Sequence, residues 1–385
     1  MAVTMPKIDI TFVQKATSLI SRSERGIAIL IVKDDTDKTF TCRQYSDLPG
    51  ALADETSYTA DNFAAISDML AFTPFKTYVF RMDAESNVSA YAGDEDSDAA
   101  GTETPRTLSV VLDEISRTVK TGWITIAGMT AEDSTALASW VQSQEKRSKS
   151  YKAVVYQTAV APDSMHVVNF VNEYVTFNDS RGKQAGTAYL PSLAAIFARC
   201  NVVRGCTNYL CSNLKFVEEV ADNDTALGKG QFILFVDEDG DVRIGQGINS
   251  MTSTDGKTRT EDMKFIETVE AMDLMRDDIA KTFRTEYLGN YRNSRDNQML
   301  FIAALNNSYF RQLAQENILD PAYANAASID VEAQRAAWMA SGKTEAADWD
   351  DDKVREMAFK RTVYLTASVK ILGSMTDLIL PINMA

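Results

Sequence analysis

Strand patterns and helix patterns alternate from about residue 26 to residue 250, and this alternation is the feature that most constrains the fold. Short apolar runs predict strands at 26–32, 77–82, 123–127 and 153–157. Three- and four-residue apolar spacing predicts helices at 63–70, 108–119, 132–146 and 191–199. Such alternation is typical of an α/β layer with a mixed, partly parallel sheet flanked by helices.

Two further segments complete this α/β region, for which we expect the bounds 23–250. Residues 84–106 are rich in Gly, Asp and Ser and lack an apolar period, so they predict a surface loop. Residues 231–236 and 241–247 flank an acidic turn and predict a β-hairpin.

The pattern changes to long helices beyond residue 250, so we expect a helix-rich domain over 251–362. Residues 261–287 carry an apolar stripe with helical spacing. Its members are Phe265, Ile266, Val269, Met272, Met275, Ile279 and Phe283. The acids Asp273, Asp277 and Asp278 beside Arg276 fit a solvent-exposed face. A second helix is predicted at 297–315, and the acidic, Ala-rich stretch after residue 321 is expected to be solvated.

Both ends of the chain are extended and apolar. Ile8, Ile10 and Phe12 share one face of a strand, which defines an N-terminal arm and hinge over 1–22. Residues 363–385 predict C-terminal strands and an arm that carries four aliphatic side chains. These are Leu378, Ile379, Leu380 and Ile382. Such strands need a partner sheet, and the pattern alone leaves open whether it belongs to the same domain or to a neighbour.

Charge and length exclude several classes of protein. The 385 residues include 54 acidic and 39 basic side chains, for a formal charge of -15, which disfavours a nucleic-acid surface. No apolar run approaches the roughly 18 residues of a membrane span, and the first residues do not resemble a secretory signal. We therefore expect a protein made in the cytoplasm that does not insert into membranes.

Candidate chemistry is sparse, and we predict no catalytic residue, no cofactor and no metal site. The one histidine, His166, has no nucleophile motif nearby and is expected to be structural or on the surface. Cys200, Cys206 and Cys211 lack metal-ligand spacing and are expected to be buried thiols. The 228–230 segment departs from a phosphate loop, and the acidic turn at 237–241 departs from a calcium loop.

Several stretches together resemble the contractile tail sheath family of phages, R-type bacteriocins and related injection systems. They lie at 6–12, 21–28, 33–36, 193–195, 207–208 and 287–290, and the segment 242–252 is the most specific of them. The resemblance spans nearly the whole chain. Larger members carry an inserted β-rich domain where this chain has only the 84–106 loop.

The resemblance implies a structural subunit that polymerises around an inner tail tube and contracts, with baseplate and terminator proteins at its ends. It also implies that Ile8, Ile10, Phe12 and the 378–382 residues pair with strands of neighbouring copies. The helix-rich domain would then face the tube. The basic residues expected to contact an acidic tube surface are Lys353, Arg355, Lys360 and Arg361.

Two other interpretations remain open at this stage. The first is a different structural protein of a virion or injection machine that lacks arm exchange. The second is an α/β enzyme without a recognisable site, because nucleotide-binding and hydrolase folds share the same alternation of strands and helices.

Overall fold

The computed structural model describes residues 20–84, 105–158, 160–200, 202 and 204–382, and these form two compact units. The first unit comprises Ser23–Asp277 and Gly373–Ala385, and the second comprises Met1–Arg22 and Asp278–Leu372. The division falls inside helix α7, Ile266–Thr282. We expected a boundary near residue 250, so the α/β unit retains more of the helical region than the change in pattern indicated.

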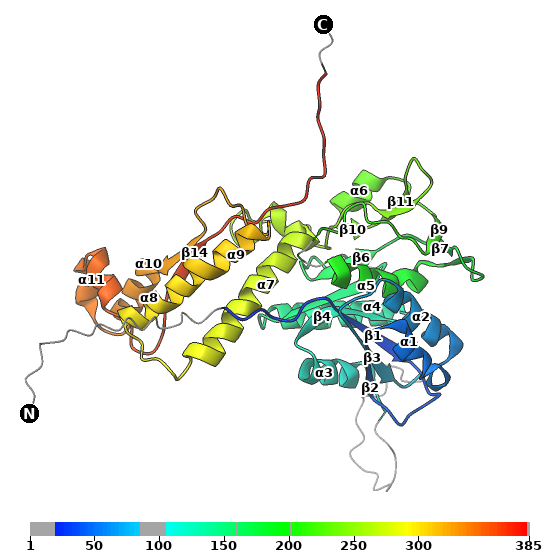
Figure 1. The fold of residues 1–385 in the computed structure, drawn as a ribbon, viewed down its shortest axis with the longest axis horizontal. Helices are drawn as coiled ribbons and strands as arrows, with labels where there is room; N and C mark the ends of the chain where they lie inside the picture. Colours follow the sequence, from blue (N-terminus) through cyan, green and yellow to red (C-terminus); the bar gives the residue numbers. More distant parts are fainter. Residues whose placement is uncertain (1–19, 85–104, 159, 201, 203, 383–385) are drawn as a thin grey trace, which may run out of the picture. The chain divides into compact units, whose positions relative to one another are not determined.

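Within the described residues, the α/β unit is built on a seven-stranded sheet (Figure 1). In spatial order its strands are β10 (Gln231–Phe232), β6 (Val167–Phe170), β5 (Ser150–Tyr156), β4 (Thr121–Ile126), β1 (Ile27–Lys33), β3 (Lys76–Met82) and β2 (Cys42–Tyr45). All neighbours pair in parallel except β2, which is antiparallel to β3. Ile29 lies opposite Tyr78 on one side and Ile124 on the other, and it is fully buried. The predicted mixed α/β sheet is confirmed.

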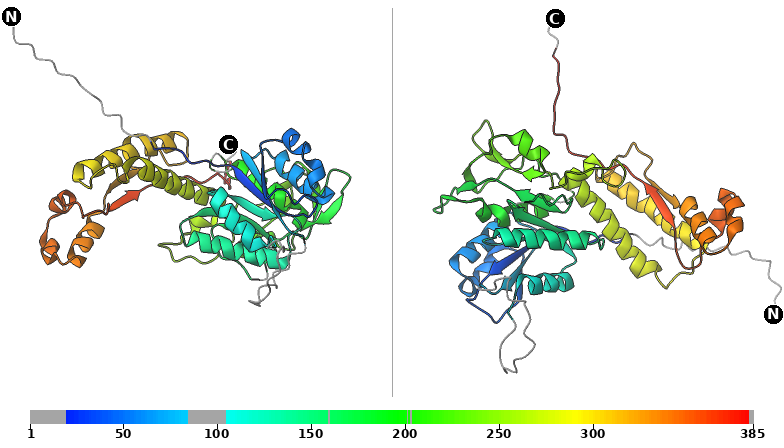
Figure 2. Two further views of the ribbon diagram at one scale, coloured as in Figure 1. Left: turned by 90° about the horizontal axis from the view of Figure 1, so that it is seen from below. Right: turned by 180° about the vertical axis from the view of Figure 1, so that it is seen from behind.

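Helices cover both faces of this sheet (Figures 1 and 2). Helices α2 (Ala60–Ala71) and α5 (Leu190–Cys200) pack together on one face. Helices α3 (Leu108–Thr118) and α4 (Ala131–Glu145) cover the other face. Thr130 and Asp133 form a reciprocal cap at the start of α4. Nearly every residue of α5 is buried, which accounts for its small and apolar composition.

Smaller elements complete the α/β unit. The hairpin of β11 (Leu234–Val236) and β12 (Val242–Ile244) confirms the predicted hairpin. In its turn, Asp237 accepts the backbone N–H groups of Asp239 and Asp241, so the turn is closed by its own hydrogen bonds. The other elements are α1 (Leu48–Leu52), β7 (Tyr174–Phe177), β8 (Lys183–Ala185), β9 (Leu214–Val217) and α6 (Asn223–Gly228).

The second unit is mainly helical. After Thr282 the chain continues as a π-helical turn, Phe283–Tyr287, and a second such turn, Leu305–Tyr309, joins α8 (Arg295–Ala304) to α9 (Phe310–Gln315). The rings of Tyr287 and Phe301 lie 4.7 Å apart and tie these helices together. The long helices predicted at 261–287 and 297–315 are thus present, with their regular pattern interrupted by π turns.

The acidic stretch after residue 321 is more ordered than we expected. It contains β13 (Ala326–Ile329), α10 (Val331–Ala340) and α11 (Asp351–Glu356). A small core of Ala346, Trp349 and Val354 lies between the helices, so these residues are not solvated, whereas the acids at 348 and 350–352 are exposed as predicted. Strand β14 (Leu365–Ser368) pairs with β13, whereas none of residues 373–382 belongs to a helix or strand.

Candidate functional site

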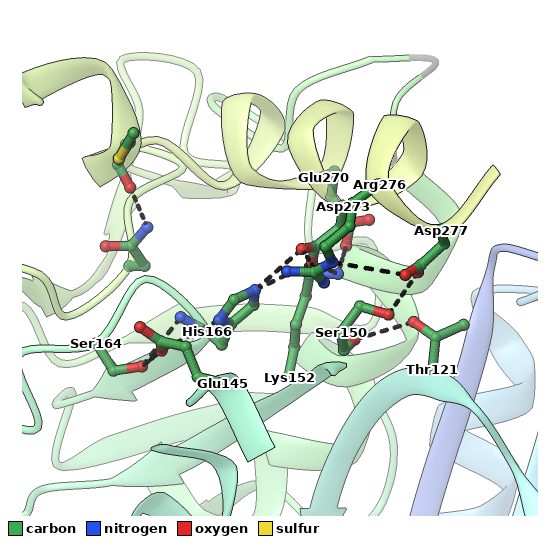
Figure 3. Close-up of polar contacts among 12 residues, drawn as sticks. Thr121, Glu145, Ser150, Lys152, Ser164, His166, Glu270, Asp273, Arg276 and Asp277 are labelled. Atoms are coloured by element: carbon green, nitrogen blue, oxygen red, sulfur yellow. Dashed lines mark hydrogen bonds and ion pairs between the residues drawn. The ribbon is translucent and has the colours of Figure 1, made fainter. Parts of the chain in front are cut away.

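A cluster of buried charges lies at the edge of the sheet where the parallel strands begin (Figure 3). Thr121 and Ser150 open β4 and β5, and His166 precedes β6, so parallel pairing brings their side chains to the same edge. Helix α7 contributes the other half of the cluster. Its acids Glu270, Asp273 and Asp277 follow one another at helical spacing and meet that edge.

Asp273 is the centre of the cluster, with a side chain that is only 3% exposed. Its carboxylate lies 2.8 Å from the Lys152 ammonium and 3.1 Å from Nε2 of His166, and it also accepts from Arg276. Burial alone would raise the pKa of Asp273, but the charges of Lys152 and His166 lower it well below its ordinary value. Asp273 is therefore ionised in the folded protein.

His166 is held between two carboxylates. Its Nδ1 lies 3.1 Å from Oε2 of Glu145 in α4, and its Nε2 faces Asp273. Ser164 donates a second hydrogen bond to the same Glu145 oxygen. Burial lowers the pKa of His166, but Asp273 and Glu145 outweigh burial and raise it above its ordinary value. The buried ring is thus structural, one of the two roles expected from sequence.

The remaining members of the cluster pair in the same way. Glu270 is 3.2 Å from Lys152 and accepts the indole N–H of Trp123 at 2.8 Å. Asp277 accepts from Arg25 at 2.9 Å and from Ser150 at 2.6 Å. Opposite charges therefore alternate through the cluster.

This arrangement fixes α7 on the sheet. Sequence reasoning placed Asp273, Asp277 and Asp278 on a solvent-exposed face, and that expectation was wrong because Asp273 and Asp278 are buried. The available signal was the run of acids at positions 270, 273 and 277, which share one side of the helix with apolar neighbours. Lys152 had no signal of its own, because a lysine inside a strand pattern usually faces solvent.

The opposite edge, where the strands end, is the place where open α/β sheets bind ligands. At the end of β1, the Lys33 ammonium lies 2.5 Å from Oδ2 of Asp133, which lies in the first turn of α4 and also belongs to the α4 cap. Asp34 accepts from Asn62 and from the backbone N–H of Thr59. The Lys33 and Asp34 side chains thus bind other groups of the same unit.

The structure describes the C-terminal residues predicted to contact neighbouring copies, but not the N-terminal ones. Ile8, Ile10 and Phe12 lie outside the described residues, as does most of the 84–106 loop. At the other end, Leu378 and Ile379 are 85% and 91% exposed, and Leu380 and Ile382 are exposed as well. The C-terminal segment is thus an extended apolar run without contacts that bury it (Figure 1).

The four basic residues lie on the surface of the helical unit. Lys353 and Arg355 belong to α11, and Arg355 pairs with Asp352 at 2.8 Å. Lys360 and Arg361 are exposed in the turn that follows, where the Lys360 ammonium lies 5.2 Å from the centre of the Phe359 ring.

Other candidate features are structural. All four cysteines are free thiols, and Cys200, Cys206 and Cys211 are buried as expected. Within the described ranges, no group of three or more His, Cys, Asp or Glu side chains is arranged to hold a metal ion. Across the same ranges, no helix combines the length and apolarity needed to cross a bilayer.

Comparison with known proteins gives concordant results. The family model of the phage tail sheath C-terminal domain matches residues 258–385. The tail sheath protein of Clostridium phage phiCD119 (strain Clostridium difficile/United States/Govind/2006) is 24% identical over 382 residues, which are 98% of each chain.

Solved structures show the same fold. The sheath tail protein of Desulfitobacterium hafniense superposes with a TM-score of 0.65 at 14% identity, over 84% of this chain and 94% of its own. The helical sheath of the anti-feeding prophage in its contracted state gives 0.66 at 13% identity, over 99% of both chains.

The fold and the C-terminal domain therefore define a sheath protein of the kind found in contractile tails and injection systems. The chain is similar to tail sheath proteins over nearly its whole length, and its function is structural, as a subunit of a contractile sheath. Its similarity to the tail sheath protein of a phage implies a component of a virion or related particle.

Proposed function

We propose that this chain polymerises around an inner tail tube as a metastable extended sheath, which contracts to drive the tube through a cell envelope. The observation that carries the proposal is the C-terminal segment, whose aliphatic side chains are exposed in the single subunit. Apolar groups in water favour association, and an extended segment can add as a strand to the sheet of a neighbour.

The N-terminal arm is proposed to act in the same way, through Ile8, Ile10 and Phe12. Arms that pair by main-chain hydrogen bonds keep neighbours connected while the bodies between them rotate. We further propose that baseplate and terminator proteins lie at the two ends of the polymer. The subunit is proposed to be made in the bacterial cytoplasm before assembly.

Contraction is proposed to need no nucleotide and no catalytic residue. If rearrangement buries about 100 Å² more apolar surface per subunit, it releases on the order of 2.5 kcal/mol for each subunit at about 25 cal/mol per Å². The ionic cluster supports a role without catalysis, because its charged groups pair with one another inside the fold.

Deletion of residues 1–16 tests the proposal. The truncated protein should keep the thermal unfolding of the full chain but remain a monomer by analytical ultracentrifugation, whereas the full chain forms hollow cylinders in negative-stain micrographs. A second truncation that removes residues 375–385 should have the same effect. Cylinders formed by either truncated protein would contradict arm exchange and favour a structural component of another kind.

The enzyme alternative is tested separately. We expect no turnover of nucleotides or esters by the purified chain. Turnover that a single substitution abolishes would contradict a purely structural role.

A further inference from the structure

The N-terminal arm begins from a segment that is fixed on α7. Ile20 is buried, the backbone N–H of Ser21 donates to Oγ1 of Thr282 at 2.9 Å, and the Lys281 ammonium donates to the carbonyl of Arg22 at 3.0 Å. From the sequence we expected an N-terminal arm and hinge over 1–22. In the described part of that segment, residues 20–22 contact the last turn of the helix.

Two arginines strengthen this attachment. Arg22 pairs with Glu316 and lies 3.6 Å from Asp278, and its guanidinium sits 5.6 Å from the centre of the Tyr309 ring. Arg25, three residues later, pairs with Asp277 at 2.9 Å. Consecutive acids of α7 thus receive two arginines of one short segment, which we call the N-terminal root, residues 20–25.

The C-terminal arm begins from the opposite end of the same helix. The backbone N–H of Ser374 donates to Oε1 of Glu267 at 2.7 Å, and its hydroxyl donates to Oε2 of the same side chain. Gly205 permits this close approach, since a Cβ there would stand 2.4 Å from Oε2 of Glu267. Gly373 and Ser374 form the C-terminal root.

We propose that α7 is a strut shared by the two arms, so that displacement of one arm is passed to the other along a single helix. Glu267 and Thr282 lie near its two ends, about 22 Å apart at 1.5 Å per residue. The ionic cluster joins the same helix to the sheet between these points, so the helix and the sheet carry the displacement together. A helix transmits displacement over that length because its backbone hydrogen bonds resist stretching, whereas an extended linker would absorb it. This inference rests on the proposed arm exchange.

The test loosens each root in particles assembled from the full chain. Arg22→Ala removes the pairs to Asp278 and Glu316, and Glu267→Ala removes both acceptors of Ser374. Matched controls are Arg295→Ala and Glu356→Ala, which break an exposed pair within the helical unit. Contraction is triggered with mild denaturant, and the fraction of partly contracted sheaths is counted by cryo-electron microscopy.

Wild-type and control particles should be either extended or fully contracted. Each root variant should raise the partly contracted fraction at least tenfold, and the double variant should match either single variant because both interrupt the same path. An unchanged fraction, or effects that multiply in the double variant, would overturn the strut. Failure of arm exchange itself is distinguishable, because polymers would then survive deletion of residues 1–16.

Hydrogen exchange on the unpolymerised chain keeps the inference testable if a variant does not assemble. Arg22→Ala should speed exchange of the Ser21 amide at least tenfold and leave the amides of β1 and β4 unchanged. An unchanged rate at Ser21 would show that Arg22 does not hold the N-terminal root.

Discussion

Asp273 shows how one side chain can fix a helix on a sheet. It receives Lys152 from β5 and His166 from the residue before β6, both buried, and Arg276 from its own helix, whose side chain is 33% exposed. Buried charges are stable only as a complete set, because each unpaired member would keep the cost of leaving water. Only a helix that supplies these acids at this spacing can pair all of the buried charges.

Asp273→Asn should lower the free energy of unfolding by about 3 kcal/mol, because Lys152 and His166 would each remain buried with one facing carboxylate instead of two. Urea denaturation followed by circular dichroism measures this change. Asp352→Asn is the control, since its pair with Arg355 is exposed and should contribute less than about 1 kcal/mol. Equal effects of the two substitutions would show that the cluster does not stabilise the fold.

The raised pKa of His166 gives stability a dependence on pH. The facing charges are Asp273, Glu145 and Lys152, and the net effect favours imidazolium in the folded state. Its contribution is fully present below the unfolded pKa of about 6.5 and is lost as pH rises through the higher folded pKa. The free energy of unfolding should therefore fall as pH rises above about 6.5, and His166→Gln should flatten this part of the curve. If the His166→Gln variant kept the full wild-type dependence of stability on pH, a group other than His166 would be responsible for that dependence.

At the scale of elements, sequence patterns predicted the main strands and helices of the α/β unit because burial on two faces leaves a strong apolar signal. The strands β7, β8 and β9 were missed, since short strands that alternate with polar residues resemble loops. The ionic cluster was missed for a different reason. Its members are distant in sequence, and only the parallel pairing of β4, β5 and β6 brings Ser150 and His166 to one edge.

One glycine between elements should be especially intolerant of change. A Cβ at Gly186, which follows β8, would stand 2.1 Å from the carbonyl oxygen of Asn172. Because a backbone atom cannot move aside without shifting its segment, Gly186→Ala should destabilise the protein by about 3 kcal/mol. Thermal denaturation checks this value. Gly228→Ala is the control, since no atom lies within 4 Å of the added carbon. Similar melting temperatures for the two variants would contradict the prediction.

At the scale of the whole molecule, the net charge is -15, but a few basic residues lie close together in the sequence of the helical unit. Most of the surface should repel other acidic surfaces, whereas Lys353, Lys360 and Arg361 present exposed positive charge at one stretch of chain. Complementary charge mainly raises the rate of association and fixes orientation. This supports the proposal that the helical unit meets an acidic tube.

Reversing two of these charges, with Lys360→Glu and Arg361→Glu together, should slow tube-templated assembly at low salt by at least tenfold. Light scattering in the presence of purified tube follows the assembly rate. Arg311→Glu, an exposed position in α9 of the same unit, is the control and should have a smaller effect. Unchanged kinetics for the double variant would remove these residues from the tube contact.

The exposed aliphatic residues of the C-terminal segment also have a consequence for the producing cell. If a neighbouring copy covers Leu378, Ile379 and Leu380, as proposed, then each newly made copy exposes them until it assembles, and exposed apolar surface favours association with other chains. Synthesis of the subunit late in assembly, when a growing sheath can incorporate it at once, would keep the time of exposure short. A surplus made without the tube should therefore assemble into empty cylinders, so the time at which the subunit is expressed decides whether sheath forms around a tube or without one.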